Sequence, residues 1–217
     1  MMPRAGRRVR AGMTLLELVI ALTVGALAVT AGVGALAMLA DRRSALLADA
    51  DHETRGLAAR RQMERWLAEV RLPLGAPVAE FRGVQGTVRT TEGDVGDDDL
   101  TFTTSAPALP SGDFASIHLH VMRDADRRSE SGRLVADVTP LRGTERAAPM
   151  RIVLAERVRG FSARYFTSAF GREEWLPSWA SGTLLPGAVQ LTVVGDVADS
   201  LPAALRVPIT VPFANGR

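Results

Sequence analysis

The sequence predicts an α+β protein in which a long N-terminal helix precedes a mostly antiparallel β-sheet domain. Residues 13–40 form an apolar run of 28 residues with a single charged side chain, Glu17. Residues 41–72 are more polar but keep apolar side chains at three- and four-residue spacings, as in an amphipathic helix. From residue 73 onward, short alternating segments between turn residues predict strands. The chain is therefore expected to fold as one helix that is partly covered by a sheet.

Composition excludes several classes of protein. With 217 residues and 47% hydrophobic residues, the chain can build one domain with a core, so it is not a disordered protein. It has no cysteine, which excludes disulfides, thiolate catalysis and cysteine-based zinc sites. Residues 1–12 hold four of the 26 basic residues, and the other 22 face 24 acidic residues. Because no basic stripe with interleaved aromatic residues is present, nucleic-acid binding is not expected.

The N-terminal segment has the charge and length of a membrane segment. Residues 1–12 are basic and free of acid, and the following 28 residues exceed the roughly 20 that cross a bilayer core. The arginines should stay in the cytoplasm, which places everything after Asp41 outside the inner membrane. A secretory signal peptide with a cleavage site at Ala35-Leu36-Ala37 is an alternative, but its apolar region normally runs only about 7–15 residues. A plain transmembrane anchor explains length and charge but leaves Glu17 unexplained.

Glu17 favours a third interpretation. A carboxylate near the centre of a bilayer costs about 2.5–3.5 kcal/mol on insertion scales, so such groups usually have a partner. If the chain is cut between Gly12 and Met13, the new α-amino group of Met13 becomes an available cation. It can pair with Glu17 of its own chain or of a neighbouring one, so that the two charges share one buried site.

This pattern resembles the class III signal of type IV prepilins and pseudopilins. The leader of that family is basic and ends in glycine, and the fifth mature residue is Glu, followed by an apolar helix. The matching residues here are Gly12, Thr14, Leu15, Leu16, Glu17 and Leu18. Met13 departs from the pattern, because members usually carry Phe there. The resemblance implies cleavage between Gly12 and Met13 by an inner-membrane prepilin peptidase, N-methylation of Met13, and filament assembly through bundled N-terminal helices that use Glu17.

The expected organisation is therefore a cleaved leader at 1–12, a transmembrane and filament-core helix at 13–40, and a periplasmic globular domain at 41–217. Within that domain a helix over 41–72 would bury Trp66 and end before Pro73, Gly75 and Pro77. The predicted strands are Leu100–Phe102, Ile117–Val121, Leu134–Val138, Ile152–Leu154, Phe161–Phe166, Val189–Val194 and Val207–Phe213. Pro208 and Pro212 make the last of them an edge or irregular strand.

The C-terminal half resembles the minor pseudopilin J of type II secretion. The segments that carry this resemblance are Gly132–Leu134, Val158–Phe166, Gly171, Trp175, Trp179 and Leu185–Val189. It implies a non-enzymatic subunit at the tip of a pseudopilus, with the I and K minor pseudopilins and the major pseudopilin as partners. Phe170, Trp175 and Trp179 are a candidate partner-facing patch, with half-buried core residues as the alternative.

Catalytic and cofactor motifs are absent from the sequence. There is no Gly-x-Ser-x-Gly and no phosphate-binding glycine loop, so an enzyme is not expected. His118 and His120 alternate on one strand face and could share a metal, but two ligands without a third favour a solvated pair. Two acidic loops, Asp94–Asp99 and Asp124–Asp126, lack EF-hand spacing and are expected to be solvated turns, although calcium is conceivable.

Two rival functions stay open. A minor pilin of a type IV pilus or DNA-uptake filament would carry the same N-terminal features. A single-pass anchored periplasmic domain that binds a ligand, or carries an enzymatic activity, would not be cleaved at Gly12 and would not depend on Glu17.

Overall fold

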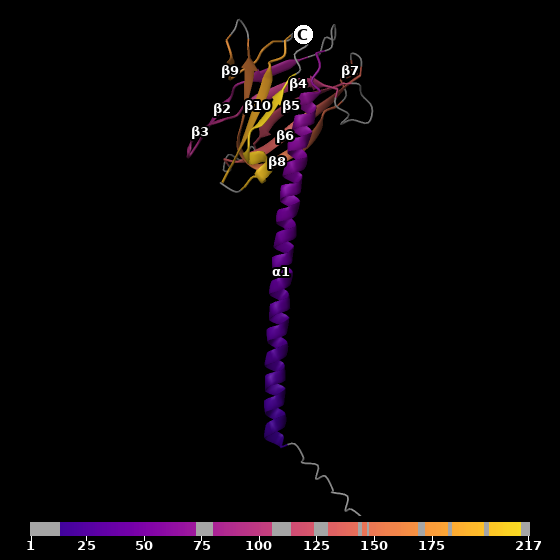
Figure 1. Ribbon diagram of the computed structural model, residues 1–217, viewed down its shortest axis with the longest axis vertical. Helices are drawn as coiled ribbons and strands as arrows, with labels where there is room; N and C mark the ends of the chain where they lie inside the picture. Colours follow the sequence, from indigo (N-terminus) through magenta and orange to yellow (C-terminus); the bar gives the residue numbers. More distant parts are fainter. Residues whose placement is uncertain are drawn as a thin grey trace, which may run out of the picture. The chain divides into compact units, whose positions relative to one another are not determined.

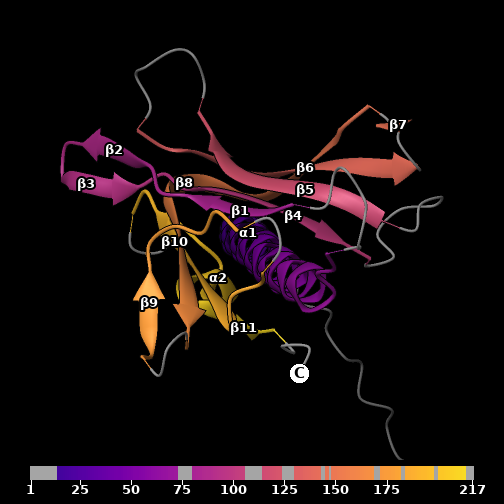
Figure 2. The ribbon, with the colours of Figure 1, turned by 90° about the horizontal axis from the view of Figure 1, so that it is seen from above.

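The computed structural model describes residues 14–72, 80–105, 114–123, 130–142, 145–146, 148–168, 172–181, 184–197 and 200–213. They form an α+β protein with one long apolar N-terminal helix and a curled, mostly antiparallel sheet (Figures 1 and 2). By its internal contacts the chain divides into two compact units, residues 1–50 and 51–217, which are described separately. This division concerns packing, so it does not test the predicted membrane boundary between residues 40 and 41.

The first helix, α1, runs from Leu15 to Ala68. It ends four residues before Leu72, the predicted end, because the end of strand β4 (Asp99–Thr104) pairs with the next backbone groups. Val70 forms a bridge with Thr104, and Arg71 N–H donates to the Thr103 carbonyl at 3.1 Å. The predicted helix-ending residues Pro73, Gly75 and Pro77 lie outside the described residues.

The main sheet has the strand order β1-β4-β5-β6-β8-β10-β11, with β7 paired to β6 and β9 paired to β8. Every strand pair in it is antiparallel. A separate two-stranded ribbon consists of β2 and β3. The bounds are β1 Phe81–Val84, β2 Thr87–Thr90, β3 Gly93–Gly96, β4 Asp99–Thr104, β5 Phe114–Met122, β6 Gly132–Arg142, β7 Glu145–Arg146, β8 Met150–Thr167, β9 Glu174–Leu176, β10 Ala188–Gly195, α2 Ala203–Arg206 and β11 Ile209–Pro212.

All seven predicted strand segments lie in or overlap strands of this sheet, and two of them merge into one strand. The segments Ile152–Leu154 and Phe161–Phe166 belong to one strand, β8, which pairs with β6 up to Val158 and with β10 from Val158 onward. Arg157, at the point where the partner changes, has φ 57°, which is uncommon for a residue other than glycine. A bulge there lets one long strand serve two neighbours.

The last strand confirms the expectation from its prolines. β11 begins at Ile209, two residues after Val207, and lies at the end of the sheet with β10 as its strand partner. Pro212 sits opposite Ala188 in this pair. An edge strand tolerates proline because the missing N–H is not needed on its open side.

The sheet curls until its first strand meets the C-terminal segments. Gly83 of β1 exchanges backbone hydrogen bonds with Trp179, at 2.7 and 2.9 Å, and the Phe81 and Phe213 rings lie 5.5 Å apart. Glycine is required at 83 because a Cβ atom there would lie 1.7 Å from the hydroxyl of Tyr165. The close approach of β1 to Tyr165 thus depends on a missing side chain.

The core of residues 51–217 lies between the C-terminal part of α1 and the concave face of this sheet (Figure 2). On the helix, Ala59, Met63, Trp66 and Leu67 are buried at three- and four-residue spacings. Trp66 is completely buried, so its predicted role as a core residue is confirmed. The sheet contributes mainly aliphatic and aromatic side chains, including Phe81, Leu100, Phe102, Ile117, Leu119, Leu134, Phe161, Tyr165, Val189 and Leu191.

The short helix α2 and its flanks are bound to α1 by polar contacts that the sequence did not indicate. The Glu53 carboxylate accepts from Ala203 N–H at 2.9 Å at the start of α2. The Arg60 guanidinium donates to the carbonyls of Ala204 and Val207 at 2.8 and 3.0 Å. An acid at the N-terminal end of a helix and a cation at its C-terminal end both complement the helix dipole.

Gly56 permits the closest contact between α1 and this segment. A Cβ at Gly56 would lie 2.1 Å from Cβ of Pro202, so the helix and Pro202 touch only because residue 56 has no side chain.

Gly56→Ala is expected to destabilise the protein by about 1 kcal/mol or more, because the overpacking exceeds the roughly 1 kcal/mol that alanine gains in a helix. Urea unfolding followed by tryptophan fluorescence measures the effect. Ala58→Gly, at an exposed position of the same helix, is the control for helix propensity. If Gly56→Ala stabilised the protein, the contact with Pro202 would be wrong.

Candidate functional site

The N-terminal end of α1 forms a regular helix cap. Glu17 N–H donates to Oγ1 of Thr14 at 3.3 Å, and Leu18 N–H donates to the Thr14 carbonyl at 3.2 Å. The Thr14-x-x-Glu17 spacing is that of a capping box, and an acid in the first turn also suits the positive end of the helix dipole. Glu17 therefore has a local role in starting the helix, a role that was not predicted although the Thr14-x-x-Glu17 spacing in the sequence indicates it.

The charge partner predicted for Glu17 lies outside the described residues. Gly12 and Met13, the predicted cleavage and methylation residues, are not among them. Within the described part of the chain, Glu17 has no ion-pair partner. The pairing of Glu17 with the α-amino group of Met13 stays a prediction.

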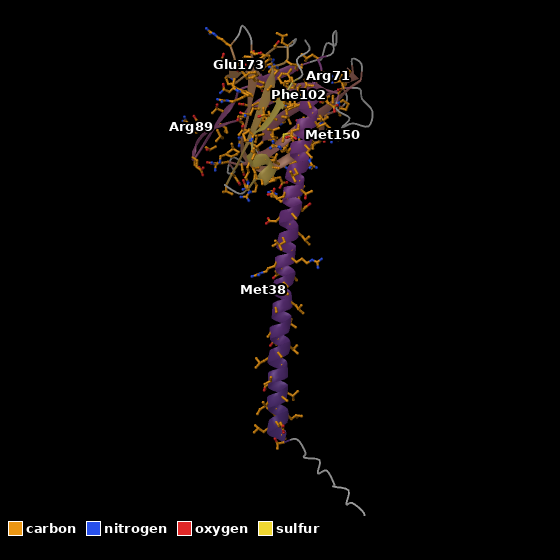
Figure 3. All side chains as sticks on the ribbon, viewed as in Figure 1. Met38, Arg71, Arg89, Phe102, Met150 and Glu173 are labelled. Atoms are coloured by element: carbon orange, nitrogen blue, oxygen red, sulfur yellow. The ribbon has the colours of Figure 1, made fainter. Side chains whose placement is uncertain are left out.

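No other described part of the chain packs against the apolar part of α1. Every residue from Leu15 to Ala50 is exposed, and Leu15 keeps 82% of its accessible surface. Figure 3 shows the side chains of this stretch, with Met38 labelled, projecting freely from the helix. α1 contains a segment that is long and apolar enough to cross a membrane. A surface of this kind needs lipid or other apolar helices around it.

Polar side chains inside this apolar stretch are satisfied by the helix itself. The Thr23 hydroxyl donates to the Ile20 carbonyl at 2.9 Å, and the Thr30 hydroxyl contacts the Ala26 and Leu27 carbonyls at 3.0 Å. Such bonds let hydroxyl groups enter an apolar environment without losing a partner. Glu17 is therefore the one side chain of residues 14–40 that carries a charge into that environment.

The two tryptophans of the candidate partner patch contact opposite faces of β8. Trp175, on β9, is 38% exposed and its ring lies 5.4 Å from that of Phe166. Trp179 is half-buried at the edge of the core, and its ring lies 6.4 Å from that of Tyr165. Successive side chains of a strand point to opposite faces, so the two rings do not form one continuous patch. Phe170, the third predicted member, lies outside the described residues.

The acidic loop Asp94–Asp99 is not the solvated turn that was expected. Each carboxylate has a different partner: Asp94 pairs with Arg89 at 3.2 Å, Asp97 with Arg123 at 2.8 Å and Asp99 with His118 at 2.9 Å. Because the carboxylates are engaged separately, they do not converge on a calcium site. The second acidic loop, Asp124–Asp126, lies outside the described residues.

Asp98 differs most from the expected solvated turn, because it is only 5% exposed and joins segments that are distant in the sequence. Its two carboxylate oxygens accept from Gly86 N–H at 2.9 Å and from Ala163 N–H at 2.8 Å. Burial raises the pKa of this carboxyl, and the two N–H groups partly oppose that effect. The carboxylate holds the base of the β2–β3 ribbon against β8.

Asp98→Asn is expected to lower the free energy of unfolding by about 2 kcal/mol, because an amide offers one acceptor oxygen to two buried N–H groups. Urea unfolding measures the loss. Asp94→Asn removes an exposed carboxylate from the same ribbon and should stay within about 0.5 kcal/mol of the wild type. Equal effects of the two substitutions would contradict a structural role for Asp98.

The two histidines lie side by side on the outer face of β5, with rings stacked 4.4 Å apart. The sheet adds two acids that sequence spacing could not place there: Asp99 on β4, 2.9 Å from His118, and Asp137 on β6, 3.9 Å from His120. Arg151 binds both oxygens of Asp137, at 2.7 and 2.9 Å, and these bonds lower the pKa of Asp137. Burial and the neighbouring His118 lower the pKa of His120.

A shallow cavity of about 580 Å³ lies beside the end of β10. Its charged side chains are engaged with each other or with the backbone: Arg159 pairs with Glu92 and donates to the Asp196 carbonyl, and Arg206 donates to the Leu201 carbonyl at 2.8 Å. This arrangement offers no nucleophile with an adjacent base of the kind that covalent catalysis requires.

Comparison with known protein families gives a match for the N-terminal segment of the chain. The model of a family described as the prokaryotic N-terminal methylation motif matches residues 7–33. That stretch includes Gly12, Met13, Glu17 and the first 21 residues of the apolar run. A comparison with curated proteins gives no match. The chain thus carries the N-terminal methylation motif of type IV pilin-like proteins, which comprise pilins and pseudopilins.

Proposed function

We propose that this protein is a minor pseudopilin of a type II secretion system. In this role it is a structural subunit at the tip of the pseudopilus and primes filament assembly for protein export across the outer membrane. The observation that carries the proposal is the methylation motif at residues 7–33, which leads directly into a helix with an uncovered apolar surface.

The exposed apolar helix supports a role in assembly. Burying a leucine side chain contributes roughly 1.5–3 kcal/mol, and this surface carries many leucines and valines without a partner in the chain. In the inner membrane lipid would cover it, and in a filament the helices of neighbouring subunits would. Glu17 then pairs with the α-amino group of Met13, which prepilin peptidase exposes. The basic leader stays in the cytoplasm and the domain of residues 41–217 lies in the periplasm.

The C-terminal domain supports the tip position and the J-type assignment. Segments similar to pseudopilin J occupy consecutive parts of the sheet: Gly132–Leu134 opens β6, Val158–Phe166 lies in β8 and Leu185–Val189 leads into β10. A bulky domain is harder to stack laterally along a shaft than to place at an end. The partners in this proposal are the I and K minor pseudopilins and the major pseudopilin, with Trp175 as the exposed aromatic contact.

A minor pilin of a type IV pilus or DNA-uptake filament shares the same motif. Deletion of the gene separates the two functions. Loss of exoprotein secretion supports the pseudopilin, whereas loss of twitching or of transformation supports the pilin.

Peptide mass spectrometry of the protein from cell membranes should find a mature N-terminus at Met13, with an added methyl group. Gly12→Leu should leave the full-length precursor, because a bulky side chain blocks the peptidase site, while Ala11→Ser should be processed normally. A first residue of Met38 would mean an ordinary signal peptide, and an unprocessed wild-type chain would mean a plain anchor.

Glu17→Gln should leave processing intact and reduce co-assembly with the major pseudopilin about tenfold or more, because it removes the charge and keeps a residue that can serve in a capping box. Crosslinking in membranes measures assembly. Thr14→Ala removes the cap and keeps the charge, and Asp49→Asn neutralises an exposed acid beyond the apolar run. Both should assemble far better than Glu17→Gln; if Thr14→Ala fails equally, helix capping and not charge pairing explains Glu17.

A further inference from the structure

We propose that Asp99, His118 and His120 form a binding site for a divalent transition-metal ion, with Zn²⁺ as the best match. One carboxylate oxygen and one ring nitrogen of each histidine lie within 4.8 Å of one another. The site is separate from the N-terminal motif, and it stands whether or not the proposed function is correct.

The sheet brings the three ligands together. His118 and His120 are two residues apart on β5, so their side chains leave the same face. On β4, Thr101 pairs with His118 and Leu100 with Leu119, which brings Asp99 to the level of His120 on that face. The rigid ladder of two central strands therefore sets the spacing of the ligand atoms, and loops play no part.

The separations suit a zinc ion after a side-chain adjustment. Tetrahedral ligand bonds of about 2.1 Å place two ligand atoms of one zinc roughly 3.4 Å apart, so the widest gap, at most 4.8 Å, must close by up to about 1.4 Å. Asp99 and His118 can make this adjustment, because their side chains are 53% and 40% exposed. Asp99 and His118 are already 2.9 Å apart.

The electrostatics also favour a cation. Of the two carboxylates beside the histidines, Asp137 is bound by Arg151, whereas Asp99 has no arginine partner among the described residues. His120 has a buried ring nitrogen, Nδ1, with no hydrogen-bond partner among the described residues, so this nitrogen is not engaged by another group there. Because a metal ion binds imidazole in its neutral form and a carboxyl group as carboxylate, the ligand set of the bound state carries a net charge of −1.

The two imidazole nitrogens and the carboxylate oxygen determine which metal ions the site prefers. Imidazole nitrogens suit zinc, copper, nickel and cobalt, whereas calcium and magnesium require oxygen ligands. Three protein ligands leave one tetrahedral position for water, as in open zinc sites. Because the site joins β4 to β5, an ion bound there would also stabilise the fold by linkage.

The test uses the full chain in detergent micelles, without a polyhistidine tag. Titration with Zn²⁺ should show one saturable site and raise the unfolding temperature. Co²⁺ should give visible absorption bands of a tetrahedral complex, which Zn²⁺ removes. A large excess of Ca²⁺ should change neither signal.

Asp99→Asn, His118→Gln and His120→Gln should each weaken Zn²⁺ binding about tenfold or more. The two variants at exposed positions, Asp99→Asn and His118→Gln, should unfold like the wild type in the absence of metal. His52→Gln, at the exposed third histidine of the chain, is the matched control and should bind normally. The proposal fails if no saturable binding occurs, if the cluster variants bind as tightly as the wild type, or if His52→Gln loses binding equally.

Discussion

The exposed apolar surface of residues 15–40 is the constraint on which the function of this protein depends. A helix that is apolar on all sides cannot remain in water, and nothing in the described chain covers it. Its environment must come from lipid or from the helices of other subunits. The single acid, Glu17, lies in the first turn, where the helix dipole and the Thr14 cap accept it. Both features lie within the segment matched by the N-terminal methylation motif.

The C-terminal part of the same helix is buried on one side only. From Gly56 onward its buried residues fall on one side and pack against the concave sheet, while Glu53 and Arg60 bind the two ends of α2. One continuous helix thus serves two environments, and the change from an all-round apolar surface to a one-sided stripe marks where each begins. The helix then ends at Ala68, because the backbone of Val70 pairs with β4.

Polar side chains on the sheet act by joining strands that are distant in sequence. Asp98, just before β4, accepts from Gly86 N–H before β2 and from Ala163 N–H in β8, and Arg151 on β8 holds Asp137 on β6. The histidines of β5 meet Asp99 of β4 in the same way. Their chemistry depends on the strand register, since a shift by one residue would turn His118 and His120 toward the core.

Local patterns in the sequence determined the long helix, the seven strand segments, the edge position of the proline-containing strand and the methylation motif. These follow from periodicity, from proline chemistry and from residue order, which act over a few residues. Tertiary structure alone decided the end of α1 at Ala68, the single long strand β8, the burial of Asp98, the placement of Trp175 and Trp179 on opposite faces, and the approach of Asp99 to the histidines. Each of these depends on which strands become neighbours, and pairing between residues far apart in the chain leaves no local pattern from which it can be read.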